Sequence, residues 1–236
     1  MSLKTFSGAA AVLAAQSASL PQPDQLCGPF SAAAALAGIV DVRIPTITEL
    51  AVASGSMVWA GHTGAARPAG VAVVRTGWNS LESAADPGAA GTSASGLVAG
   101  IEGATDHAVA VVPISAPTAA ELETLMDSLM CSTLHFGVVC NVRTRFMVDI
   151  DWDVGHFVAA WGYDEHTGEV AIADTYAELG TVGMPPGCRL VPSTALADAM
   201  TADGGRGLLV LVPAGERDAA LGIAEVLGLR TAVWST

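Results

Sequence analysis

The sequence has few basic residues, few aromatic residues and no long apolar run. Lysine and arginine together number 10, against 23 aspartates and glutamates, which gives a formal net charge of −13 at pH 7. Nucleic acids and anionic membrane surfaces attract concentrated positive charge, which this chain lacks. No apolar stretch approaches the roughly 18 residues of a transmembrane helix. These deficits predict a protein without nucleic-acid or membrane partners, and the sequence leaves its oligomeric state open.

Cysteine is also scarce. The chain has four cysteines, at positions 27, 131, 140 and 188. They are too scattered for a disulfide scaffold, they form no Cys-x-x-Cys pair, and the histidines show no spacing typical of zinc sites. We therefore expect no metal, no cofactor and a reducing, cytoplasmic location. Residues 1–20 imitate a secretory signal only faintly, because Ser7 and Gly8 interrupt a weakly apolar run that suits an opening helix better.

What remains is the composition of a globular protein. Hydrophobic residues make up 51 % of the 236 residues and charged residues 14 %, which excludes a disordered chain. A chain of this length can bury a sizeable core, and we expect a single domain over residues 1–236.

The order of the predicted elements indicates the fold class. Helix formers and helical spacing predict three helices within about 1–60, over residues 7–17, 27–39 and 46–57. Thr46 or Thr48 is expected to cap the third helix. Residues 61–106 are small and of low complexity, which predicts an insertion or loop-rich part with a short helix plausible on either side.

The sheet-forming part is expected within 107–213. Five β-rich runs lie at 107–114, 135–142, 156–163, 169–176 and 207–213, with helices predicted at 118–130 and 193–200 and a closing helix at 215–229. Helices that precede a group of strands favour the α+β class, with a mostly antiparallel sheet packed against the N-terminal helices.

Cys27 stands at the start of the second predicted helix, in the stretch QPDQLCGPFS. The free N–H groups and the dipole of a helix N-terminus stabilise a thiolate, which is the nucleophilic form of cysteine. Gln22 precedes it in a loop with two prolines, where its amide and the Cys27 N–H would form an oxyanion hole. Gln25 is the alternative for this role. The alternative interpretation is purely structural. Cys27 would then be a small buried hydrophobic residue at a helix start, and Gln22 and Gln25 would be polar residues of a surface loop.

His156 and Asp174 lie on a predicted β-hairpin. His156 begins one strand, DEHTG forms the turn, and the returning strand ends at Asp174, so the two residues are expected to be neighbours. Asp174 would fix the imidazole tautomer and leave the other ring nitrogen for Cys27.

The chain resembles the papain-like cysteine peptidase superfamily, and within it the bacterial leader-processing (bacteriocin-type) peptidases. The resemblance lies in the order of four motifs: a Gln, then Cys-Gly-Pro, then Gly-His before an apolar strand, then a returning strand that ends in Asp. The resemblance implies an N-terminal helical half led by the nucleophile, a C-terminal half of antiparallel strands, and catalytic roles for Cys27, His156, Asp174 and Gln22. It covers residues 20–40 and 135–176, and Thr175 stands where the family often has proline.

The expected function is a thiol hydrolase or acyl transferase that acts on a peptide or acyl substrate, with a peptide bond as the preferred target. Two alternatives remain open at this point: an inactive peptide-binding module of the same fold, or a thioester-using acyl transferase or cyclase in peptide natural-product processing. Three acids, Asp149, Asp151 and Asp153, are placed where they could form an acidic rim that favours cationic peptides.

Overall fold

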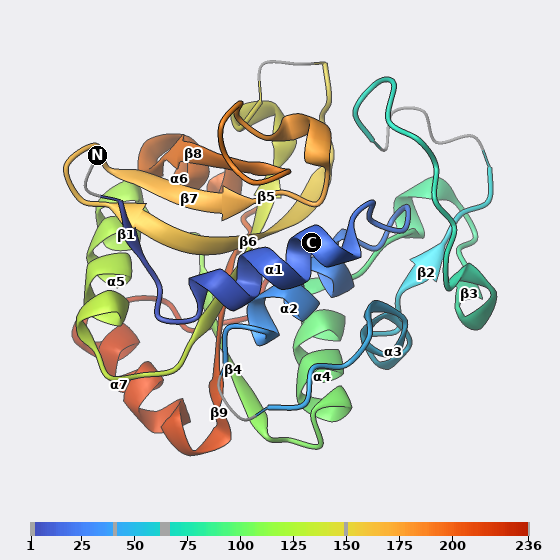
Figure 1. Ribbon diagram of the computed structural model, residues 1–236. Helices are drawn as coiled ribbons and strands as arrows, with labels where there is room; N and C mark the ends of the chain where they lie inside the picture. Colours follow the sequence, from blue (N-terminus) through green and yellow to red (C-terminus); the bar gives the residue numbers. More distant parts are fainter. Residues whose placement is uncertain (1–2, 40–41, 62–66, 149–150, 236) are drawn as a thin grey trace.

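The computed structural model describes residues 3–39, 42–61, 67–148 and 151–235, and its elements follow the α+β order expected from the sequence (Figure 1). The first helices are α1 (Ala9–Ser19), α2 (Cys27–Leu36) and α3 (Ile47–Ala53). The remaining helices are α4 (Ala94–Ala104), α5 (Ala119–Cys131), α6 (Ser193–Thr201) and α7 (Arg217–Val226).

A seven-stranded sheet forms the centre of the molecule. Its strands are β1 (Lys4–Thr5), β4 (Val109–Ser115), β5 (Gly137–Arg143), β6 (Gly155–Asp164), β7 (Glu169–Ala173), β8 (Cys188–Pro192) and β9 (Gly207–Pro213). The order is β4-β9-β5-β6-β7-β8, and β1 pairs with β6. Every pairing in this sheet is antiparallel, so the expected mostly antiparallel α+β arrangement is confirmed.

Helices cover both faces of the sheet, because the inner strands are apolar on both sides. Along β4, Val109 and Val111 pack with α2, α3 and α4, whereas Ala110 and Val112 pack with α5, α6 and α7. The residues of β6 divide in the same way, since Phe157 belongs to the cluster with α2, α3 and α4 and Val158 to the cluster with α5, α6 and α7. The sequence predicted the first layer, and the C-terminal helices complete a second one.

Helix α2 is the most enclosed helix of the N-terminal half. All of its residues from Gly28 to Leu36 are buried, which explains why its sequence has no polar face. Small residues allow the close approach: a β-carbon added to Gly137 of β5 would lie 2.5 Å from the Ala35 carbonyl oxygen. Ser31 Oγ also donates a hydrogen bond of 2.9 Å to the Phe157 carbonyl. The helix that carries Cys27 is thus fixed directly to the strand that carries His156.

Three regions differ from the sequence prediction. The third helix ends at Ala53, before Gly55 at φ +60, and of the two expected caps it is Thr46 that caps it, together with Glu49. The loop-rich part predicted at 61–106 holds more structure than a long loop: β3 (Glu82–Ser83) pairs in parallel with β2 (Met57–Val58), and α4 forms where a short helix was considered plausible. Strand β8 was not predicted. None of the helices in the described ranges is long and apolar enough to cross a membrane.

Candidate active site

Cys27 is the first residue of α2 and is partly exposed. Leu26, at the N-cap, contributes no side-chain hydrogen bond, so no side chain from the cap position competes for the N–H groups at this helix start. Gly28 favours close packing, since a β-carbon there would lie 3.3 Å from both the Phe157 and the Thr92 side chains, which would have to shift slightly. The Cys-Gly-Pro sequence therefore brings the thiol close to strand β6 at the end where His156 lies.

The hairpin of β6 and β7 forms as predicted and brings His156 and Asp174 together. Ala159 pairs with Ala173, and the turn closes at Gly168, whose φ of +68 suits glycine. His156 Nε2 lies 3.0 Å from Asp174 Oδ1, and both side chains are buried. This contact leaves Nδ1 as the ring nitrogen that faces other partners.

The electrostatics of this pair favour its charged form. Burial acts to lower the pKa of His156, but the Asp174 carboxylate and a hydrogen bond with the Cys27 side chain outweigh it and raise the pKa to about 9. Burial acts to raise the pKa of Asp174, yet the charges of His156 and Arg189 hold it below its usual value. Near neutral pH the arrangement is therefore an imidazolium between a carboxylate and the Cys27 sulfur.

The two glutamines of the cysteine loop have different surroundings. Gln25 bonds the Trp59 backbone on both sides: its Nε2 donates to the carbonyl at 3.0 Å, and its Oε1 accepts from the N–H at 2.7 Å. Gln22 is buried, and its Nε2 donates to the Tyr176 hydroxyl at 3.0 Å. The Gln25 amide thus anchors the chain near β2, while the Gln22 amide belongs to the surroundings of His156.

Two aromatic residues that the sequence analysis did not single out enclose the imidazole. The Trp152 ring meets the His156 ring edge-on at 5.0 Å, and the Tyr176 ring stacks on it at 5.8 Å. Both aromatic side chains are buried. The position of Tyr176, two residues after Asp174, is a sequence signal that places it near the site. Trp152 lies in an acidic stretch that was interpreted only through its charges.

Asp174 has further partners that come from elements distant in sequence. Arg189 on β8 donates from Nη2 to Asp174 Oδ2 at 2.9 Å, and Gln16 on α1 donates to the Asp174 carbonyl at 2.8 Å. The Thr175 hydroxyl lies 3.4 Å from His156 Nε2, a contact that a proline at this position would lack. No sequence motif pointed to Arg189, because strand β8 was itself not predicted.

The acidic rim expected from the sequence is not supported at Asp153. Its carboxylate pairs with Arg143 and with Arg145, the latter at 2.9 Å, so its charge is offset locally. Asp151 is exposed, and Asp149 lies outside the described residues. The structure thus gives no basis for counting Asp153 as a free negative charge that attracts cationic peptides.

Chemically, these side chains comprise a thiol, a buried imidazole hydrogen-bonded to a carboxylate, and an amide that donates through its N–H groups. Among the residues that the structure describes, no group of three or more His, Cys, Asp or Glu side chains is arranged to hold a metal ion. A search of curated proteins found no match to the chain. The family DUF6885, a family of unknown function, matches residues 6–150 and 146–235. The chain therefore belongs to the DUF6885 family.

Proposed function

We propose that the protein is a papain-like thiol hydrolase or acyl transferase that acts on a peptide bond through a Cys27 acyl-enzyme. The buried His156–Asp174 pair, hydrogen-bonded at 3.0 Å beside Cys27 at the start of α2, is the observation that carries this proposal. A base within reach of a nucleophile and oriented by a third group is the recurring arrangement of covalent catalysis. The order of helices and antiparallel strands supports the papain-like comparison.

In the proposed reaction, the Cys27 sulfur attacks the carbonyl carbon, and the new C–S bond places negative charge on the carbonyl oxygen. The Cys27 N–H and the Gln22 amide are the proposed donors to that oxygen. His156 gives its proton to the leaving amine as the C–N bond breaks. Water or a second amine then attacks the thioester, His156 accepts its proton, and the Cys27 thiolate leaves.

The enclosure of the imidazole supports this assignment. Trp152 and Tyr176 shield the His156–Asp174 contact from water, and a hydrogen bond between charged groups is stronger where the local dielectric is low. A buried histidine with a purely structural role would not need a partly exposed thiol as its neighbour. This neighbour supports the proposal over an inactive peptide-binding module of the same fold, which the acylation experiment below tests.

Acyl-enzyme trapping tests the proposal without knowledge of the natural substrate. With p-nitrophenyl acetate, we expect a burst of nitrophenolate and an acetyl group located on Cys27 by peptide mass spectrometry. Cys27→Ala is the control and should give no burst. Addition of an amine during turnover separates transfer from hydrolysis. A protein whose Cys27 stays unmodified while other thiols are acetylated would refute the proposal and favour a binding module.

A further inference from the structure

Tyr176 touches each of the three side chains proposed to act with Cys27. Its ring stacks on His156 with an interplanar angle of 18°. Its backbone N–H donates to Asp174 Oδ1 at 3.2 Å, and its hydroxyl accepts a hydrogen bond of 3.0 Å from Gln22 Nε2. The first two contacts lie within the hairpin, whereas the third connects the sheet to the loop before α2.

The contact with Gln22 determines where that amide points. Gln22 lies in the loop between α1 and α2, and a glutamine side chain in a loop has several rotamers. An amide nitrogen carries two N–H groups, and the bond to the Tyr176 hydroxyl uses one of them. The other N–H is then held in a fixed direction. Donors to an oxyanion are effective when they are oriented before the reaction begins.

We propose that Tyr176 is a positioning residue whose hydroxyl holds the Gln22 amide, so that its second N–H meets the oxyanion formed at Cys27. The inference rests on the proposed function and adds a role for Tyr176. Burial and the nearby Cys27 charge raise the pKa of Tyr176, so its hydroxyl stays protonated in the working pH range. Because Tyr176 follows β7 and Gln22 precedes α2, the bond also aligns the sheet half with the helical half.

Two reactions of the same thiol separate this role from a structural one. Acylation of Cys27 by p-nitrophenyl acetate passes through an oxyanion, whereas alkylation by iodoacetamide does not. Tyr176→Phe keeps the ring over His156 and removes only the hydroxyl. We expect Tyr176→Phe to slow acylation by about 10-fold, less than the 100-fold or more that follows loss of an oxyanion donor. Alkylation at pH 6 should change by less than about 2-fold, after subtraction of the Cys27→Ala background.

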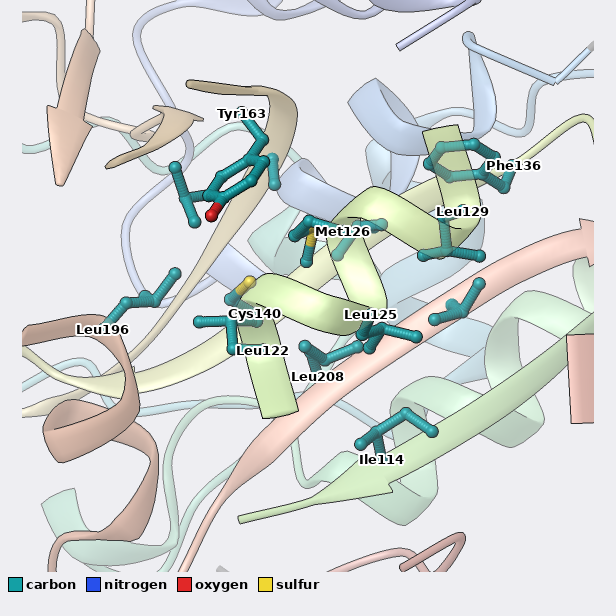
Figure 2. Close-up of a cluster of buried hydrophobic side chains, with 14 of the residues drawn as sticks. Ile114, Leu122, Leu125, Met126, Leu129, Phe136, Cys140, Tyr163, Leu196 and Leu208 are labelled. Carbon is teal, nitrogen blue, oxygen red and sulfur yellow. The ribbon is translucent and has the colours of Figure 1, made fainter. Parts of the chain in front are cut away.

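The chain offers a matched control, because Tyr163 is its only other tyrosine. Tyr163 is buried in the hydrophobic cluster between the sheet and α5 that also contains Met126 and Leu122 (Figure 2). Tyr163→Phe makes the same chemical change and should leave both reactions as they are. Gln22→Ala should slow acylation by about 100-fold, and adding Tyr176→Phe to it should slow the reaction no further.

Three results would overturn the role of Tyr176: unchanged acylation in Tyr176→Phe, an equal loss in both reactions, or an additive loss in the double variant. An equal loss in both reactions would mean that the hydroxyl only supports the fold. Failure of the proposed function looks different. In that case Cys27 of the unaltered protein would react with both reagents no faster than a free thiol, before any variant is compared.

Discussion

Two clusters of opposite charges lie in the sheet half of the molecule, and they differ in burial rather than in distance. One contains His156, Asp174 and Arg189, with contacts of 3.0 and 2.9 Å and side chains that are at most 10 % exposed. The other contains Arg143, Arg145, Asp153 and Asp203, with an Arg145–Asp153 contact of 2.9 Å and side chains that are 25–42 % exposed.

The comparison shows that burial decides how strongly a charge affects its neighbours, because water screens the charges of the exposed cluster. In the exposed cluster, solvent and salt screen each contact, and surface pairs contribute little to stability. In the buried cluster, each charge depends on its partner, because a buried charge without one is costly. A single carboxylate can therefore set the protonation of His156, whereas the arginines beside Asp153 stay protonated with or without it.

The largest expected effect comes from the thiol that the buried cluster acts on. Cys27→Ala should abolish acylation by p-nitrophenyl acetate at this site and leave the fold intact, since it removes one sulfur from a partly exposed position. Burst kinetics and a thermal melt measure the two properties. Acylation that survives this change would show that another residue is the nucleophile.

The next largest effect is expected for Asp174→Asn. Asparagine keeps the shape of the side chain but removes its negative charge. Arg189 is then buried without its charged partner, and the imidazolium of His156 loses the carboxylate that stabilises it. We expect the acylation rate to fall by about 10³-fold and stability to fall by about 3 kcal/mol. Burst kinetics and urea unfolding measure these changes. An Asp174→Asn protein as stable and as reactive as the original would mean that burial does not distinguish the two clusters.

The interaction between His156 and Asp174 should also make the stability of the protein depend on pH. The pKa of His156 is raised from 6.5 to about 9 on folding, so its protonation stabilises the folded state fully below pH 6.5. That contribution is lost as the pH rises through about 9. We expect the free energy of unfolding to decrease between pH 7 and pH 10, with a smaller decrease in Asp174→Asn. NMR of labelled histidine should place the His156 titration near pH 9, and an ordinary titration near 6.5 would contradict the account.

The smallest effect is expected for Asp153→Asn, the counterpart of Asp174→Asn in the exposed cluster. Arg143 and Arg145 retain Asp203 as a partner, and water solvates what remains. The acylation rate should change by less than about 2-fold, and 0.5 M salt should remove even that difference. Initial rates at low and high salt provide the measurement. A loss comparable with that of Asp174→Asn would show that the exposed cluster takes part in the reaction.

Local patterns in the sequence predicted the parts of the site that local structure determines. The small residues after Cys27 predicted α2, and the alternation around the DEHTG turn predicted the hairpin that joins His156 to Asp174. The sequence offered Thr46 or Thr48 as the cap of the third helix, and in the structure Thr46 forms a capping box with Glu49. Each of these features depends on residues close together in the chain, so spacing alone was informative.

The partners that the sequence did not predict depend on contacts between distant segments. Arg189 reaches Asp174 only because β8 pairs with β7, and Gln22 meets Tyr176 across 154 positions. No local pattern of residues indicates which distant segments pair. The acidic stretch near Trp152 was misjudged for a related reason: the arginines that pair with Asp153 lie across a strand connection, so its charge looked free in the sequence.

The central claim is that buried His156, held as an imidazolium by Asp174, activates the Cys27 sulfur. The most direct test is the rate of iodoacetamide alkylation at Cys27 between pH 5 and pH 9, located by peptide mass spectrometry, with the exposed thiol of Cys131 as an internal reference. The account predicts that Cys27 reacts at pH 6 at least about 10-fold faster than Cys131, and that Asp174→Asn removes most of this advantage. Equal rates for Cys27 and Cys131 at every pH would contradict it.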